Sequence, residues 1–129
     1  MAADEHARLA WLTNNASDVH GDTHRAGEGP FGQPIVLGAL SVAIVAGLAA
    51  PAAPPPGRAG KAIAIGWRRI SLGRPVLAGD TLRASSSVAS RTNPVDGGGF
   101  VERVVTGWNQ HDQPVVVFEE TCWAPSCSA

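Results

Sequence analysis

The stretch Ile35-Val-Leu-Gly-Ala-Leu-Ser-Val-Ala-Ile-Val-Ala-Gly-Leu-Ala-Ala50 decides the fold, because it carries no charge and a proline stands directly before and after it. As a helix it would be roughly 24 Å long at 1.5 Å per residue, against about 30 Å of hydrocarbon in a bilayer. A helix that is apolar on all sides and too short to cross a membrane belongs in a protein core. We therefore expect a buried central helix over residues 35–50 and no association with a membrane.

The chain before this helix divides into two segments. Residues 4–13 have the spacing of a short helix, with apolar side chains on one face at Ala7, Leu9, Trp11 and Leu12. Residues 14–33 are polar and rich in glycine, which predicts a long loop. Loops of this length in compact domains are often functional.

The chain after the helix is typical of an antiparallel sheet. A proline-rich connection over residues 51–57 leads to four segments with strand character, at 61–70, 80–91, 100–108 and 115–123, with turn sequences at 93–99 and 109–112. In the first of them Ile63, Ile65 and Trp67 alternate, so we expect them on one face. The fold class is therefore α+β, with about four or five antiparallel strands curled around one helix.

The composition indicates a single domain over residues 1–129 with its own core. The net charge is −1, and Arg68-Arg69 is the only adjacent basic pair, so no basic surface for nucleic acid is expected. The polar start predicts no secretory signal. Cys122 and Cys127 form neither a disulfide framework nor a zinc site, and we expect them reduced in a cytoplasmic protein that holds no metal or other cofactor.

Three short stretches carry the signal for function. The first is Asn15-Ala-Ser-Asp-Val-His-Gly-Asp22, and the second is Phe31-Gly-Gln-Pro-Ile-Val-Leu-Gly38 at the start of the expected helix. The third is Pro75-Val-Leu-Ala-Gly-Asp-Thr-Leu82, at the start of an expected strand. A Gly-Asp-Thr-Leu sequence alone would be a weak turn signal, but the three stretches stand in a fixed order.

In these stretches the chain resembles the MaoC-like hydratase/dehydratase family. That family carries Asp-x-Asn-Pro-x-His-x-Asp, then Phe-Gly-x-Pro-Ile-(Val/Ala)-His-Gly at its central helix, then Pro-Val-x-x-Gly-Asp-Thr-Leu. The resemblance implies a hot-dog fold, in which a sheet wraps around one helix. It also implies a reaction that adds water to a 2-enoyl thioester, or removes it from a 3-hydroxyacyl thioester, of coenzyme A or a carrier protein.

The resemblance assigns His20 as a catalytic base, which suits a histidine because its ring accepts a proton near neutral pH. An isolated loop histidine would more often be a solvated residue. Gly38 is assigned to the oxyanion site, because amides at a helix start have no partner within the helix and can bind a developing enolate oxygen. A glycine here also permits close packing, and the two roles are compatible.

The chain departs from the family at the second catalytic position. Asn15 replaces the family's aspartate, and an amide cannot deliver a proton at neutral pH. Ser17 and Leu37 replace the family's Asn and His and, with Asp22, are candidate substrate-binding residues. Asp18 or Asp22 could take over the missing acid, although aspartates in such segments commonly stabilise turns.

Three functions remain open at this point. The chain is an acyl-thioester hydratase/dehydratase that works through His20 with Asn15, a reshaped pocket that cyclises a polyketide-like substrate, or a non-catalytic binding protein. All three imply a small acyl ligand as partner, possible carriage of that ligand by coenzyme A or a carrier protein, and no nucleic acid. We also expect a homodimer, because a sheet of so few strands leaves its edges open.

Overall fold

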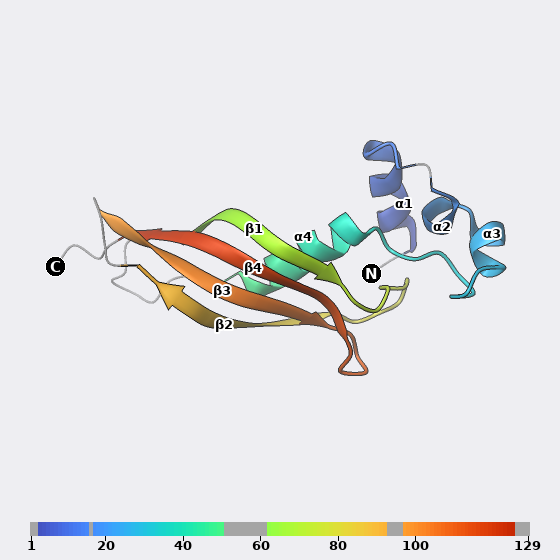
Figure 1. Cartoon of the computed structure of the whole chain (residues 1–129). Coiled ribbons are helices and arrows are strands. Elements are labelled where there is room, and N and C mark those ends of the chain that lie inside the picture. The colour runs from blue at the N-terminus through green and yellow to red at the C-terminus, as the bar shows by residue number, and fades with distance from the viewer. Residues whose placement is uncertain (1–2, 16, 51–61, 93–96, 126–129) are drawn as a thin grey trace.

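The computed structural model describes residues 3–15, 17–50, 62–92 and 97–125, which form four helices and four strands (Figure 1). The elements follow in the order α1 (Ala3–Leu12), α2 (Asp18–Gly21), α3 (Thr23–Gly27), α4 (Gly38–Ala49), β1 (Ile63–Leu72), β2 (Arg83–Arg91), β3 (Gly98–Trp108) and β4 (Pro114–Pro125). The strands form one antiparallel sheet in the order β1-β4-β3-β2, so the predicted α+β class is confirmed.

The central helix α4 lies along one face of the sheet, over β2, β3 and β4 (Figure 1). It begins at Gly38, three residues later than expected, because the preceding residues are extended. Ile35 forms an antiparallel bridge with Leu77, and the Val36 N–H donates to the Val76 carbonyl at 2.8 Å. The helix ends at Ala49, since the next residue precedes a proline and adopts an extended conformation.

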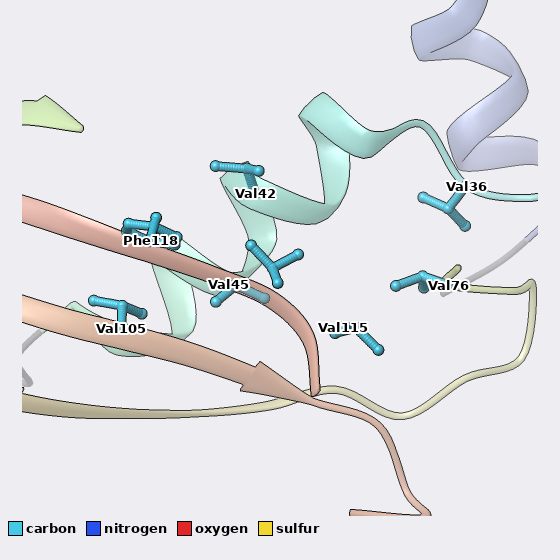
Figure 2. Packing of buried hydrophobic residues seen from close by; sticks show 8 residues of the cluster. Val36, Val42, Val45, Val76, Val105, Val115 and Phe118 are labelled. Carbon is cyan, nitrogen blue, oxygen red and sulfur yellow. The ribbon is translucent and has the colours of Figure 1, made fainter. Parts of the chain in front are cut away.

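The core lies between α4 and the sheet and consists mainly of valine (Figure 2). Val45 of α4, Val105 of β3 and Phe118 of β4 are fully buried. Gly107 of β3 lies directly under Val45, so closely that a Cβ at position 107 would overlap the Val45 side chain. The helix can therefore approach the sheet only because β3 carries no side chain at that point.

Strand β1 does not keep the simple alternation expected of it. The pairing with β4 shifts between Ala64 and Gly66, so Ile63 pairs with Trp123 and Trp67 pairs with Glu120. Paired residues share a face, and Trp123 and Glu120 stand three apart on β4, on opposite faces. The prediction that Ile63 and Trp67 share a face is therefore wrong, because a bulge inserts a residue between them.

The segment 14–33, expected as a loop, contains α2 and α3, which gather with α1 near the N-terminal end of α4 (Figure 1). Helix α1 was expected to bury one apolar face. Its Trp11 and Leu12 side chains are instead 85% and 82% exposed, and Ala10 is the buried contact. Helix α1 packs mainly against α2.

The remaining predictions for the fold have mixed outcomes. The turn at 109–112 is confirmed, with Asn109 Oδ1 accepting hydrogen bonds from the His111 and Gln113 N–H groups at 3.0 and 3.1 Å. The connection 51–57, most of the turn at 93–99 and Cys127 lie outside the described residues. Across the ranges that are described, no helix has the length and apolar character needed to span a membrane.

Candidate active site

His20 is held at the end of α2 by the segment that leads into α4. Its Nδ1 lies 2.8 Å from the Ile35 carbonyl oxygen, and the Ile35 N–H donates to the Val19 carbonyl at 3.0 Å. Because a carbonyl oxygen only accepts hydrogen bonds, Nδ1 carries the proton in the neutral ring and Nε2 carries the lone pair. The contact therefore fixes both the orientation of the partly buried ring and the nitrogen that can act as a base.

The N-terminus of α4 provides backbone N–H groups that have no hydrogen-bond partner within the helix. The first hydrogen bond of the helix runs from the Ser41 N–H to the Leu37 carbonyl at 3.0 Å, so the N–H of Gly38 comes before it. A Cβ on Gly38 would lie 2.5 Å from Leu72 Cδ1. Glycine at this position allows the end of β1 to close against the start of the helix, and it leaves the helix start accessible.

His20 and Gly38 line the same cavity, which has a volume of about 360 Å³ and is called the His20 cavity below. Its other lining residues come from the segment before α4, from α4 itself, from the end of β1 and the residues that follow it, and from β4, and include Phe31, Ser41, Leu72 and Arg74. Most of the wall is apolar, and the described lining residues include no carboxylate. An apolar cavity with a few convergent polar groups is the usual form of a small-molecule site.

Two polar residues of this cavity were not identified from the sequence. Ser41 is 3% exposed and lies one helical turn after Gly38, a spacing that places both on one helix face. Its Oγ donates to the Leu37 carbonyl at 3.2 Å. Arg74 immediately precedes the Pro75-Val76 pair of the third motif, and that position is the signal that could have indicated it.

Asn15 does not line the His20 cavity. It is exposed and lines a separate cavity of about 470 Å³ between α1 and α2, and His20 is not among the described residues of that second cavity. The Asn15 Oδ1 accepts the Ser17 N–H at 3.3 Å, which is a local turn contact. His20 and Gly38 thus line one cavity, and Asn15 lines another.

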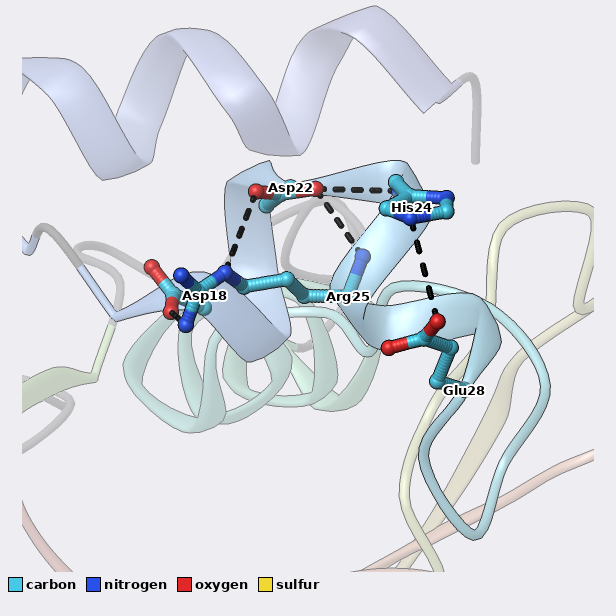
Figure 3. A network of polar contacts seen from close by, with 5 residues as sticks. All are labelled: Asp18, Asp22, His24, Arg25 and Glu28. Atoms are coloured by element: carbon cyan, nitrogen blue, oxygen red, sulfur yellow. Dashed lines mark hydrogen bonds and ion pairs between the residues drawn. The ribbon is translucent and has the colours of Figure 1, made fainter.

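Ser17 and Asp22 lie with Asn15 rather than with His20. Ser17 precedes α2 and makes no capping bond with its side chain, whereas Asp22 caps α3 by accepting the His24 and Arg25 N–H groups at 3.0 Å each (Figure 3). The hydrogen bond from the Arg25 N–H is the main reason that the pKa of Asp22 is below its usual value. An aspartate that is held ionised in this way is a poor proton donor.

The other substituted motif position, Leu37, belongs to the core. Its side chain is 4% exposed, and it is not among the described residues of the His20 cavity. Its backbone serves as the N-cap of α4 and accepts both hydrogen bonds from Ser41. Leu37 thus acts on the cavity only through the position of the helix start.

The third motif has a structural role at Asp80. Its Oδ2 accepts the Leu77 N–H at 2.9 Å, and its Oδ1 accepts the Gln110 side-chain amide at 2.7 Å. Gly79 has a φ of +93°, a conformation that favours glycine. The Gly-Asp pair therefore shapes the turn that sets Val76 and Leu77 against the segment before α4.

A second polar cluster lies under the C-terminal half of α4. Arg103 is ion-paired with Glu120 at 2.5 Å, and its Nη1 donates to the Ala49 carbonyl at 2.9 Å. Trp67 Nε1 and Cys122 Sγ also donate to the Glu120 carboxylate, at 2.9 and 3.2 Å. Burial alone would raise the pKa of Glu120, but these donors outweigh it and lower the pKa below its usual value.

The thiol of Cys122 belongs to the same cluster. Burial, together with the neighbouring Glu120 carboxylate, raises the pKa of Cys122 to about 11, so the thiol is protonated at neutral pH.

Within the described ranges, no group of three or more His, Cys, Asp or Glu side chains lies close enough together to hold a metal ion.

Comparison with known proteins identifies the family. A family model described as a MaoC like domain matches residues 1–109. The solved structure of R-hydratase PhaJ1 from Pseudomonas aeruginosa is 27% identical, with a TM-score of 0.77, and the match covers 98% of this chain and 76% of that one. The (R)-hydratase from A. caviae involved in PHA biosynthesis is 25% identical, with a TM-score of 0.75, over 95% and 86%.

A third structure, a MaoC-like dehydratase from Rhodospirillum rubrum, is 19% identical with a TM-score of 0.82 over 100% of this chain and 87% of that one, and this likeness shows the fold. No match was found among curated proteins. The expected hot-dog fold is thus confirmed by structures that superpose over nearly the whole chain. Because the family model also covers most of the sequence, the chain belongs to the MaoC-like family of hydratases and dehydratases.

Proposed function

We propose that this chain hydrates 2-enoyl thioesters, or dehydrates 3-hydroxyacyl thioesters, with His20 as the base. The observation that carries the proposal is that His20 and the N-terminus of α4 at Gly38 line one cavity, with Nδ1 of the ring bound to the Ile35 carbonyl. A base and an oxyanion site that share one apolar cavity meet the two main requirements of the reaction.

In the hydration direction, His20 Nε2 takes a proton from water while the water oxygen forms a bond to C3 of the enoyl group. The C2–C3 double-bond electrons move toward the thioester carbonyl, whose oxygen becomes an enolate oxygen. The imidazolium then returns its proton to C2, and the product is a 3-hydroxyacyl thioester. One water is added in total, and dehydration is the same sequence reversed.

The enolate oxygen would be bound by amides at the start of α4. The Gly38 N–H precedes the helical ladder, and the helix dipole places partial positive charge at this end. Such prearranged donors stabilise charge that develops in the transition state more than charge in the ground state. Ser41 stabilises the first turn of α4, because its N–H and its Oγ both donate to the Leu37 carbonyl.

In this scheme one histidine performs both proton transfers, and Asn15 takes no part. The separation of Asn15 from the His20 cavity supports that choice, as does the inability of an amide to donate a proton at neutral pH. Ser17 and Asp22, which lie with Asn15, are likewise assigned to the local structure of α2 and α3 rather than to substrate binding.

A second candidate function rests on the lack of a carboxylate among the described lining residues of the His20 cavity. A cavity with a base but no carboxylate also suits a ring closure of a polyketide-like substrate, in which shape directs the reaction and His20 removes one proton. A protein that binds its ligand without turnover is the third candidate. Measured turnover of a simple enoyl thioester separates the first candidate from the other two.

We also propose that the chain forms a homodimer through β1. This strand lies at one edge of the sheet and exposes five large apolar side chains, Ile63, Ile65, Trp67, Ile70 and Leu72, each between 49% and 58% exposed. The opposite edge, β2, is rich in serine and exposes one large apolar side chain, Val88. An exposed apolar edge strand is a template for pairing, and a twofold axis beside β1 would bury it.

The test of the proposed reaction is the hydration of a crotonyl thioester by the wild type and by His20→Ala. Loss of a general base lowers turnover by about 10²–10⁴-fold, so the variant should be nearly inactive. His24→Ala is the matched control, because that histidine is exposed, lies four residues away and does not line the His20 cavity.

Circular dichroism and thermal melts of the three proteins show whether each is folded. Turnover that is equal in the wild type and in folded His20→Ala would remove His20 from the mechanism. A folded wild type that hydrates no enoyl thioester would favour the cyclase or the binding protein.

A further inference from the structure

Among the arginines that the structure describes, Arg74 stands out because it lines a cavity without forming an ion pair with a described carboxylate. Five other arginines, Arg25, Arg68, Arg69, Arg83 and Arg103, are each ion-paired with Asp or Glu side chains. The structure gives the Arg74 guanidinium no ion pair with any described residue. Arg74 is exposed, and it lines the His20 cavity.

The backbone holds Arg74 in this place. Its N–H donates to the Pro114 carbonyl at 3.2 Å, and the Gly73 N–H donates to the Val115 carbonyl at 2.9 Å. A Cβ at Gly73 would lie 2.5 Å from the Pro114 oxygen, so this glycine is needed for the close approach. The guanidinium therefore extends from a fixed point beside the N-terminus of α4.

The described lining residues of the His20 cavity carry a net positive charge, unlike those of the cavities beside Asn15 and under the C-terminal half of α4. Its described lining residues combine Arg74, His20 and the positive end of α4, with no Asp or Glu. The cavity beside Asn15 contains two carboxylates, Asp18 and Asp22. In the cavity under the C-terminal half of α4 the charge of Arg103 is neutralised by Glu120.

We propose that the His20 cavity selects thioester ligands that carry an oxyanion, and that Arg74 binds this group. The inference rests on the proposed acyl-thioester function and adds the charge of the ligand to it. A guanidinium offers a planar pair of donors that matches a carboxylate or a phosphate, and such charge-assisted hydrogen bonds are stronger than neutral ones. Two sources share this chemistry: a carboxylate on the acyl group, and the phosphate of a pantetheine arm.

Binding of three saturated thioesters tests the proposal without need of turnover. The ligands are butyryl-N-acetylcysteamine, which is neutral, the glutaryl monothioester of N-acetylcysteamine, which adds a carboxylate, and butyryl-4′-phosphopantetheine, which adds a phosphate. Isothermal titration calorimetry should give the wild type about tenfold tighter binding of at least one anionic ligand than of the neutral one, the effect of one charge-assisted contact at a partly exposed site.

The variants show whether Arg74 causes this preference. In Arg74→Gln the gap between anionic and neutral ligands should close, and Arg74→Lys should keep part of it, because the charge remains but the planar pair of donors is lost. Arg91→Gln is the matched control: this arginine is exposed on β2, has no ion pair with a described residue and does not line the cavity. It should keep the full gap.

The outcomes are distinct from those of the turnover assay. Preference for the glutaryl ligand identifies the acyl group as the source of the anion, and preference for the phosphopantetheine ligand identifies the carrier arm. Equal binding of all three ligands, no binding of any of them, or a preference that persists in Arg74→Gln would overturn the proposal. Hydration of the crotonyl thioester alongside equal binding would leave the proposed reaction standing and refute only the role of Arg74.

Discussion

The ring of His20 and the backbone of Ile35 are joined by a contact of 2.8 Å between Nδ1 and the carbonyl oxygen. The two residues are fifteen apart in the sequence, and the contact is reinforced by the hydrogen bond from the Ile35 N–H to Val19. Because Ile35 also bridges to Leu77, α2 is tied to the segment that precedes α4 and, through it, to the connection between β1 and β2. The position of the His20 ring thus depends on α2, on the segment before α4 and on the segment that contains Leu77.

Asn15→Asp tests whether position 15 contributes a proton. Since Asn15 lines a different cavity and is bound to the Ser17 N–H, we expect crotonyl thioester turnover to change less than about threefold, well below the effect of a positioned general acid. The measurement is a steady-state assay with thermal melts in parallel. A gain of about tenfold or more would contradict the assignment and would show a dehydratase that lacks only its acid.

Gly107→Ala should destabilise the domain. The added methyl would overlap Val45, so α4 has to move away from the sheet, at a cost of about 1–3 kcal/mol. Urea unfolding measures the loss. Gly66→Ala is the control, because nothing lies within 4 Å of a Cβ at that strand position.

Adding Val45→Ala to Gly107→Ala makes room for the new methyl group, so the double variant should lose less than the sum of the single losses. Strict additivity of the two changes would be evidence against the proposed overlap.

Glu120→Gln tests the buried cluster. Removing one charge of a buried pair leaves the Arg103 guanidinium without its partner, which costs about 3 kcal/mol. Glu119→Gln is the control, since that carboxylate is ion-paired with Arg68 and Arg69 at the surface, where such pairs contribute little. Unfolding of both variants at neutral pH is the measurement, and equal losses would refute the special role of Glu120.

The same cluster predicts a dependence of stability on pH. The pKa of folded Glu120 is lowered from 4.5, so its contribution is complete above 4.5 and is lost as the pH falls through the folded pKa. The free energy of unfolding should therefore fall less steeply on acidification below 4.5 in Glu120→Gln than in the wild type. Parallel curves for the two proteins would contradict this prediction.

Ile65→Lys tests the edge at which we place the dimer. A lysine on an edge strand opposes pairing with a second strand, so this variant should be monomeric at micromolar concentration, where we expect a dimeric wild type. Val88→Lys on β2 is the control, because its side chain is similarly exposed, at 51% against 56%, on the opposite edge. Light scattering gives the masses, and a wild type that is monomeric, or an Ile65→Lys dimer, would refute the interface.

Much of the architecture follows from local sequence. The apolar run that contains α4, the strand segments and the turn at Asn109 were predicted because side-chain periodicity and turn residues act over a few positions. The motifs around His20, Gly38 and Asp80 likewise identified the family from the sequence. Each of these features depends on residue types within a short window, and such windows can be read without knowledge of distant contacts.

Only the tertiary structure decided how these parts meet. The bulge in β1 separates Ile63 from Trp67, because one extra residue reverses the faces of a strand. Asn15 and His20, five apart in a motif, line different cavities, whereas Arg74 lines the His20 cavity from the connection that follows β1. Such placements depend on packing and hydrogen bonds between segments far apart in the chain, and residue spacing carries no information about them.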